Sequence, residues 1–478
     1  MNKVRTRFAP SPTGFMHLGG LRTALYAFLY AKHGGGDFIL RIEDTDKERF
    51  VEGALEVIYS SLNESGLKYD EGPDVGGNYG PYVQSERKEI YAKYAKELID
   101  LGGAYYCFCS KERLESLTDE NGNRKYDKHC LNLSKEEVEA RIKNGEPYVI
   151  RQNIPTTGTS SYNDLIYGTI EVDYSDLEDN ILIKSDGMPT YNFANVIDDH
   201  LMGITHVIRG TEYLSSTPKY NLMYDAFGWE RPVYIHLPTI MKDATRKLSK
   251  RYGDANFDDF ISKGYVEEAI INYVALLGWC PKNNAEIMNL SEMIELFDLS
   301  GISKSPSIFD EVKLRWMNGE YLKAMSEDEF VERATPFFEK SSVYGKYDIS
   351  KIAKLIKTRI EILSDIPSVV EFLTAPTFID GTLYENAKQK TSAELAKSLL
   401  PIIYGGLEKI DNFENSNLFA SLSNLATENG VNKRQLFWIM RIALTGREIT
   451  PGGATEIAEI LGKKECLERI NFAINSLN

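Results

Sequence analysis

The amino-acid sequence predicts an α/β fold, in which a parallel-sheet domain carries an α+β insertion and is followed by an all-helical C-terminal half. The first observation is the opening order of strand, loop, helix and strand, which is typical of a parallel βαβ unit. The second is the helical spacing of apolar residues beyond about residue 257. The length of 478 residues exceeds that of a single hydrophobic core, so we expect several domains.

The N-terminal elements can be read in order. Residues 4–9 alternate as a strand does, and two prolines and a glycine within residues 10–14 end that pattern. Apolar side chains then recur at helical spacing over residues 21–29, and the glycines at 34–36 end the predicted helix. A second strand over residues 38–42 completes the βαβ unit.

A polar segment at about residues 105–186 interrupts the α/β pattern. It contains short strand-like pieces at residues 148–151 and 181–184, and the α/β pattern resumes at residues 190–209. We therefore predict an insertion in the parallel-sheet domain. In the C-terminal half, the runs Val266–Leu277, Ile352–Phe372 and Leu436–Leu444 are amphipathic and predict helices.

Composition indicates a soluble protein of the cytoplasm. Hydrophobic residues make up 42% and charged residues 26% of the chain, and no stretch approaches the roughly 20 apolar residues of a membrane helix. The charged N-terminus has no apolar run behind it, so no signal peptide is predicted. The net charge of -15 gives no general attraction to nucleic acid, so an RNA partner would need local basic patches.

Two loops carry residues suited to phosphate chemistry. Residues 12–20 form a glycine-bearing loop between a strand and a helix, where free N–H groups and the helix dipole favour polyphosphate; the alternative is a tight turn with a satisfied histidine. Residues 246–253 form a basic loop that suits a pyrophosphate leaving group; the alternative is a solvated run of charge.

Three of the five cysteines, Cys107, Cys109 and Cys130, lie close together in the sequence, which suggests a metal site. Cys280 and Cys466 are isolated and are expected to be ordinary core cysteines. A reducing compartment excludes a disulfide framework.

The two loops together resemble the signatures of the class I aminoacyl-tRNA synthetases. His17-Leu18-Gly19-Gly20 resembles their "HIGH" motif with its last histidine replaced, and Lys247-Leu248-Ser249-Lys250-Arg251 resembles their "KMSKS" motif. Four further segments, at residues 7–14, 41–46 and 195–200 and at Leu314–Gly319, are similar to the bacterial-type glutamyl-tRNA synthetases. The resemblance runs through most of the chain and implies a Rossmann-type catalytic domain.

The resemblance implies two binding sites. The glutamate pocket would consist of Arg7, Ala9, Ser11, Glu43, Tyr191, Asn195 and Arg209. The ATP site would consist of Thr13, Gly14, His17, Gly19, Gly20, Lys247, Ser249, Lys250 and Arg251, with His17, Lys247 and Lys250 as the catalytic phosphate contacts. An arginine guanidinium can bind a carboxylate through two parallel hydrogen bonds, and a glutamate side chain can bind an ammonium group. Which of the two arginines binds which carboxylate of the substrate is left open.

The implied activity is ATP-dependent ligation of L-glutamate to tRNA(Glu) through a glutamyl-adenylate, with Mg²⁺ on the phosphates. A non-discriminating form that also charges tRNA(Gln) is the alternative. Two other classes remain: a nucleotidyltransferase that never binds tRNA, and a catalytically inactive RNA-binding paralogue. The long helical half disfavours the former, and the complete set of motif residues disfavours the latter.

The resemblance also implies a structural zinc site made by Cys107, Cys109, Tyr126 and Cys130, with His129 as the other possible fourth ligand and a metal-free insertion as the alternative. Arg359 is implied as an anticodon contact and a monomer is the expected state. The implied parts are residues 1–100 and 189–253 for the two catalytic halves, 101–188 for an insertion that binds the tRNA acceptor end, 254–324 for a stem-contact domain, and 325–378 and 379–478 for two helical anticodon-binding subdomains.

Overall fold

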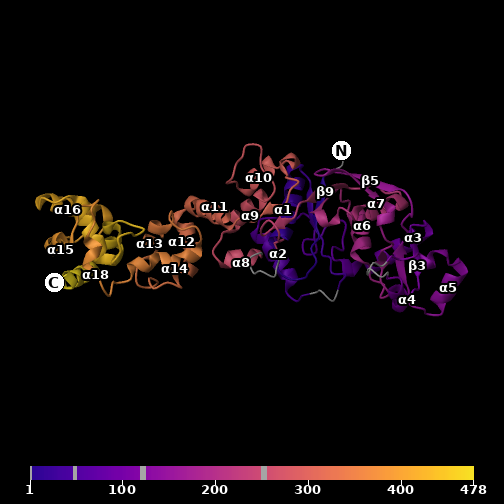
Figure 1. The fold of residues 1–478 in the computed structure, drawn as a ribbon, viewed down its shortest axis with the longest axis horizontal. Coiled ribbons are helices and arrows are strands. Elements are labelled where there is room, and N and C mark those ends of the chain that lie inside the picture. Colours follow the sequence, from indigo (N-terminus) through magenta and orange to yellow (C-terminus); the bar gives the residue numbers. More distant parts are fainter. Residues whose placement is uncertain (1–2, 47–50, 119–124, 249–255, 478) are drawn as a thin grey trace. The chain divides into compact units, whose positions relative to one another are not determined.

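The structure is a computed structural model that describes residues 3–46, 51–118, 125–248 and 256–477. The chain forms two compact units (Figure 1). The first comprises Met1–Ile261 and Ile270–Asp310, and the second comprises Ser262–Ala269 and Glu311–Asn478. Within the described residues, no helix is long and apolar enough to cross a membrane.

A largely parallel layer of two adjacent sheets is the centre of the first unit. One sheet pairs β1 (Arg5–Phe8) with β2 (Asp37–Leu40). The other contains, in spatial order, β6 (Gly168–Asp173), β5 (Thr159–Asp164), β9 (Val233–Leu237) and β8 (His206–Gly210). Strands β1 and β2 pair in parallel, as do β8 and β9, and β9 also meets β5 in parallel. Strand β8 lies beside β1, where the Thr205 N–H donates to the Arg5 carbonyl at 3.0 Å. The predicted βαβ opening is confirmed.

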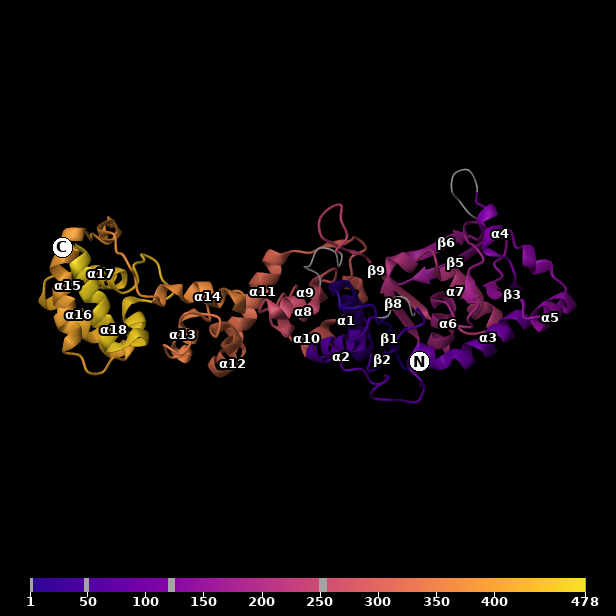
Figure 2. The ribbon, with the colours of Figure 1, turned by 90° about the horizontal axis from the view of Figure 1, so that it is seen from below.

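Helix α1 (Leu18–His33) packs against β1 and β2 (Figure 2). Its apolar side chains Leu21, Leu25 and Leu29 are buried, as their helical spacing predicts. The helix begins three residues before the predicted start, because the Nδ1 atom of His17 accepts a hydrogen bond from the Gly20 N–H and caps the first turn. It ends at His33, and Gly34, the first residue of the predicted glycine run, caps it.

The inserted segment forms a separate antiparallel sheet of β3 (Ala104–Cys107), β4 (Val149–Gln152) and β7 (Ile181–Ile183). Two of these strands were predicted. The hairpin β5–β6 from the same segment joins the parallel sheet through a single pairing of Asp164 with Tyr234, which the sequence did not reveal. The other α-helices between β2 and β9 are α2 (Ala54–Glu64), α3 (Lys88–Asp100), α4 (Lys111–Ser116), α5 (Lys135–Lys143), α6 (Tyr191–Leu201) and α7 (Thr217–Phe227).

The described residues beyond 257 are mainly helical, as predicted, but they include the short strand β11 (Ser307–Ile308). This strand pairs in parallel with β10 (Ile240–Met241). The helices on either side are α8 (Phe257–Ser262), α9 (Glu267–Leu276) and α10 (Leu290–Leu296).

The second unit is helical around one continuous apolar core, and Figure 2 shows its last four helices in one bundle. Its helices are α11 (Glu311–Ala324), α12 (Glu327–Phe338), α13 (Ile349–Ile356), α14 (Ile366–Val369), α15 (Ala393–Glu408), α16 (Asn415–Glu428), α17 (Lys433–Thr445) and α18 (Ala454–Leu477). The expectation of one helical run over Ile352–Phe372 is wrong. Helix α13 ends at Ile356, and Pro367 starts α14 because proline fits the first turn of a helix but not its interior.

A buried carboxylate fastens α6 to the segment from Gln84 to Tyr91, which lies between β2 and the inserted segment. Asp198 accepts hydrogen bonds of 2.8 Å from Gln84, from the guanidinium of Arg87 and from the hydroxyl of Tyr91, and all four side chains are buried. Because these donors share one acceptor group, we expect its loss to leave several polar groups unpaired in the core.

The variant Asp198→Ala should lower the free energy of unfolding by about 3–5 kcal/mol, since it leaves a buried guanidinium without its partner. Urea denaturation measures this change. The matched control is Asp225→Ala, which removes the half-exposed ion pair with Arg231 and should cost less than about 1 kcal/mol. Equal losses in the two variants would contradict the assigned role of Asp198.

Candidate active site

The glycine-bearing loop after β1 surrounds the start of α1. Gly14 has a φ of 120°, a backbone conformation that favours glycine. At Gly19 a Cβ atom would lie 3.1 Å from the imidazole of His17, so a side chain there would crowd the ring. The Thr13 N–H donates to the Ser11 carbonyl at 2.8 Å, which closes the turn before the helix. The sequence therefore forms an open, glycine-lined helix N-terminus capped by His17.

The two predicted phosphate loops, although far apart in the sequence, meet at one cavity of about 210 Å³. The first loop contributes His17, Gly19 and Gly20, and the second contributes Leu248. The rest of the lining comes from Leu18, Arg22, Gly210, Glu212, Leu237, Pro238, Thr239 and Ile240. A helix N-terminus facing such a cavity can accept a polyphosphate.

The second loop begins as a narrow hairpin. The Leu248 N–H donates to the Ile240 carbonyl at 3.1 Å, and the side chain of Asp243 pairs with Arg246 across the turn. Lys247 is exposed. The predicted residues Ser249, Lys250 and Arg251 lie outside the residues that the structure describes.

A buried network of alternating charges lies at the carboxyl ends of β1 and β2. Arg7 donates to both carboxylate oxygens of Asp199, at 3.0 and 3.2 Å. Arg41 donates to Asp199 at 2.7 Å and to Glu43 at 3.0 Å. All four residues are less than 10% exposed. The Arg7 guanidinium is therefore already neutralised by a neighbouring carboxylate.

Arg209, at the carboxyl end of β8, has a different environment. Its Nε–H donates to the Nε2 atom of His236 at 3.1 Å, and its Nη2 donates to the Thr217 hydroxyl at 2.7 Å. Rings of tyrosine surround the guanidinium, whose central carbon lies 5.0, 4.9 and 5.5 Å from the ring centres of Tyr213, Tyr220 and Tyr234. Among the described residues no carboxylate bonds to Arg209, which is only 5% exposed. A buried cation with neutral partners is suited to an anionic ligand.

The other predicted pocket residues lie on the elements around Arg209. Tyr191 opens α6, and its ring lies 5.3 Å from that of Tyr213. Asn195 follows one turn later and donates to the Tyr191 carbonyl at 2.6 Å, within its own helix. Ala9 is half-buried and Ser11 exposed in the loop after β1.

Electrostatic coupling connects four of the predicted pocket residues. Burial raises the pKa of the Tyr191 hydroxyl, while Arg209 and Arg7 oppose that rise and Glu43 adds to it. Burial also raises the pKa of Glu43, against the lowering effect of Arg41 and Arg7. The structure thus brings the predicted pocket residues Arg7, Glu43, Tyr191 and Arg209 together.

The sequence interpretation missed several residues of this site. Arg41 and Asp199 belong to segments that carried the resemblance, and an acidic pair inside an apolar helix was the available signal for Asp199. No local signal identified His236 or its neighbour Asp164, because the two are far apart in the sequence and meet only through the sheet.

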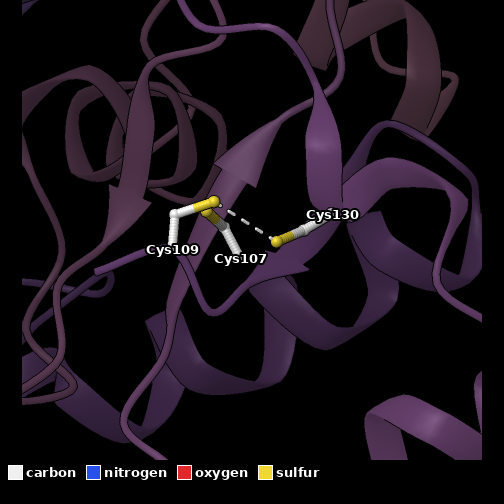
Figure 3. A group of neighbouring side chains, drawn as sticks. All are labelled: Cys107, Cys109 and Cys130. Carbon is white, nitrogen blue, oxygen red and sulfur yellow. Dashed lines mark hydrogen bonds between the residues drawn. The ribbon is translucent and has the colours of Figure 1, made fainter. Parts of the chain in front are cut away.

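The three clustered cysteines point toward one another in the insertion (Figure 3). Of the two isolated cysteines, Cys466 is buried as expected, whereas the expectation of a core position for Cys280 is wrong because this residue is exposed. Their sulfur atoms lie within 4.8 Å of one another, and the Tyr126 hydroxyl lies 3.3 Å from the Cys107 sulfur and 3.5 Å from the Cys109 sulfur. His129 is exposed, so the geometry favours Tyr126 over His129 as the fourth group. Burial raises the pKa of Cys109 to about 11. A bound metal ion would offset this, because it favours the thiolate form.

Arg359 lies in the second unit, in the turn just after α13 and not inside a helix. Its backbone N–H donates to the Ile356 carbonyl at 2.8 Å, and its side chain is exposed. The neighbouring Ile360 is buried, which fixes the turn to the core.

Comparisons with known proteins agree with this architecture. The model for class I tRNA synthetases (E and Q), catalytic domain, matches residues 3–316, and the model for an anticodon binding domain matches residues 329–474. The chain therefore belongs to the class I tRNA synthetase (E and Q) family.

The similar proteins of known name are glutamate–tRNA ligases. A glutamate–tRNA ligase of Clostridium kluyveri is 56% identical over 481 residues, which cover 100% of this chain and 99% of that relative. A glutamate–tRNA ligase of Clostridium acetobutylicum is 56% identical over 484 residues, with the same coverage. The crystal structure of a glutamate tRNA ligase from Elizabethkingia meningosepticum, in complex with its amino acid, is 37% identical and has a TM-score of 0.90 over 100% of both chains.

Acid should weaken the Asp199 network. Burial opposes ionisation of this carboxyl, but Arg7 and Arg41 hold its pKa below the ordinary 3.8. A carboxyl with a lowered native pKa contributes stability that is present above its unfolded pKa and is lost as pH falls through the native value. The variant Asp199→Asn lacks this contribution. The stability difference between the parent protein and the variant, measured by urea denaturation, should therefore shrink as pH falls from about 6 to about 3. A constant difference would contradict the assignment.

Proposed function

We propose that the protein is a glutamate–tRNA ligase, which uses ATP to join L-glutamate to tRNA(Glu) and releases AMP and diphosphate. The observation that carries the proposal is the cavity shared by the His17 loop and Leu248, together with a buried Arg209 whose hydrogen-bond partners among the described residues are neutral. Gly210, which follows Arg209 in β8, lines the same cavity. The names of the relatives support the same activity.

The reaction has two steps. The α-carboxylate of glutamate attacks the α-phosphorus of ATP, the bond to pyrophosphate breaks and glutamyl-adenylate forms. A terminal ribose hydroxyl of the tRNA then attacks the acyl carbon and AMP leaves. Neither step needs a covalent enzyme intermediate, so the residues of the site act by positioning the reactants and neutralising charge.

The nucleotide would lie against the first turn of α1. Thr13, Gly14, Gly19 and Gly20 let the backbone approach the phosphates, and His17 donates to a phosphate oxygen. For this donation the imidazole would use Nε2, because Nδ1 caps the helix. Lys247, Ser249, Lys250 and Arg251 would contact the leaving pyrophosphate, whose charge grows in the transition state. ATP enters as its Mg²⁺ complex.

Glutamate would occupy the space bounded by Arg7, Glu43 and Arg209. Arg209 offers its unneutralised charge to a carboxylate, and Glu43 accepts the ammonium group. Ala9, Ser11, Tyr191 and Asn195 complete the pocket. Glutamine would turn its amide NH₂ toward guanidinium donors, and such a mismatch allows strong discrimination without an editing site.

The other parts of the chain would serve the tRNA. Residues 101–188 bind the acceptor end, residues 254–324 the stem, and residues 325–378 and 379–478 the anticodon; the match of residues 329–474 to an anticodon binding domain supports the last assignment. We also propose a monomer, in which one chain supplies both loops of the cavity. The cytoplasm is the compartment that fits ATP and tRNA as substrates.

Zinc is the metal that we propose for Cys107, Cys109, Tyr126 and Cys130. Three mutually close sulfurs and one oxygen fit the four-coordinate, closed sites in which structural zinc is held. A bound zinc ion would crosslink these four residues and would take no part in the charging reaction. The role of the four residues is to join strand β3 to the loop at residues 126–130.

The activity is tested by charging purified tRNA(Glu) and tRNA(Gln) transcripts with labelled glutamate. We expect charging of tRNA(Glu), and loss of at least about a hundredfold in kcat/KM for Arg209→Leu, because a buried partner for a carboxylate is removed. The control variant Arg231→Leu changes an arginine on the surface and should charge tRNA(Glu) with the kcat/KM of the parent protein. Normal charging by the Arg209 variant would overturn the pocket, and no charging of either tRNA by the parent protein would overturn the function.

Elemental analysis should find about one zinc ion per chain, as expected for one four-ligand site. Cys130→Ser should lower the zinc content and the thermal stability of the protein, whereas Cys280→Ser, at an exposed cysteine outside the cluster, should change neither. Metal-free protein of full stability would refute the zinc site.

Arg359→Ala should reduce charging of tRNA(Glu) by about tenfold or more through a higher KM for the tRNA, since an exposed arginine can bond to or stack on an unpaired base. Glutamate and ATP binding should not change. Lys354→Ala, exposed in α13 on the same stretch of chain, is the control. An Arg359 variant with an unchanged KM for tRNA would contradict the anticodon assignment.

A further inference from the structure

Three neighbouring strands place a row of polar side chains beneath Arg209. In the parallel pairing of β8 with β9, Arg209 stands opposite His236. On the other side of β9, strand β5 ends at Asp164, which pairs in the ladder with Tyr234. Asp164 and His236 have no exposed side-chain surface. The sheet register, rather than any segment of sequence, therefore brings these groups into one line.

The hydrogen bonds define the state of the imidazole. The Oδ2 atom of Asp164 lies 2.7 Å from Nδ1 of His236 and accepts from its backbone N–H at 3.0 Å. The Oδ1 atom accepts from the backbone N–H groups of Ile166 and Tyr167, at 2.9 and 2.8 Å. A carboxylate with this many N–H donors is ionised, so Nδ1 of His236 carries the proton and Nε2 is left as an acceptor. That acceptor receives the Nε–H of Arg209 at 3.1 Å.

A neutral acceptor is suited to a guanidinium that must bind an anion. Asp199 holds Arg7 through a direct ion pair, which orients Arg7 but also neutralises it. Among the residues that the structure describes, His236 and Thr217 are the hydrogen-bond partners of the Arg209 side chain, which leaves its charge and its Nη1 group for a ligand. A carboxylate in the place of His236 would compete with the substrate for the same cation.

We propose that Asp164 and His236 are positioning residues for glutamate binding: Asp164 fixes the Nδ1–H tautomer of His236, and His236 in turn fixes the guanidinium of Arg209 toward a substrate carboxylate. This inference rests on the proposed function. It assigns a role to two residues that do not touch the substrate, and it explains why a buried aspartate and a buried histidine lie behind the pocket.

The first test replaces His236 in the full-length protein. His236→Gln keeps an acceptor oxygen near the position of Nε2, whereas His236→Leu has none. We expect His236→Leu to raise the KM for glutamate by about tenfold or more, and His236→Gln by less than about threefold, with the KM for ATP nearly unchanged in both. A purely structural role would alter both KM values together. Equal effects of the two variants on glutamate, or parallel changes in both KM values, would overturn the proposal.

The second test does not depend on activity, and it reads the state of His236 in the parent protein. Nitrogen-15 NMR of the intact protein, labelled in its histidines, reports the protonation of each ring nitrogen, and the signals missing from His236→Gln identify His236. We expect a neutral imidazole with its proton on Nδ1. A proton on Nε2, or a doubly protonated ring, would overturn the relay. If the parent protein charges no tRNA but His236 has the expected tautomer, the proposed function fails while the hydrogen-bonded relay stands without a substrate role.

Discussion

The ion pair between Arg7 and Asp199 is the interaction on which the first unit depends. It joins the first strand of the chain to a helix that follows almost two hundred residues later, and Arg41 ties the second strand to the same carboxylate. Burying these charges is costly unless each is paired and hydrogen-bonded, so the network constrains the position of all its members. The inserted segment can therefore be long without separating the two halves of the sheet.

The same constraint explains the difference between the two arginines of the predicted pocket. Arg7 belongs to the structural network, and its charge is matched within hydrogen-bond distance. Arg209 is held by a histidine and a hydroxyl, and three tyrosine rings lie around its guanidinium. In the proposed pocket, a substrate carboxylate would therefore bind at Arg209 rather than at Arg7.

Much of this could be predicted from the sequence, because the decisive signals are local. Alternation located β1, the helical spacing of apolar residues located α1, and the cysteine spacing located the cluster around Cys107. The helical run over Ile352–Phe372 was wrong, since amphipathic spacing cannot distinguish one helix from short helices that share a core. The Asp164–His236 contact could not be predicted from the sequence, because tertiary packing decides the register of the strands.

The arrangement of the sheet also accounts for the position of the cavity. In an open parallel sheet, ligands bind beyond the carboxyl ends of the strands, where loops and helix N-termini converge. Here β1 ends at the loop before α1, β8 ends at Gly210, and β9 ends at the segment that leads to Leu248. The start of α1 after the first of these ends, and Gly210 next to the buried Arg209 at the second, both line the cavity. The proposed activation of a carboxylate by a nucleotide needs a phosphate site and a cation close together, and they are close because β8 lies between β9 and β1.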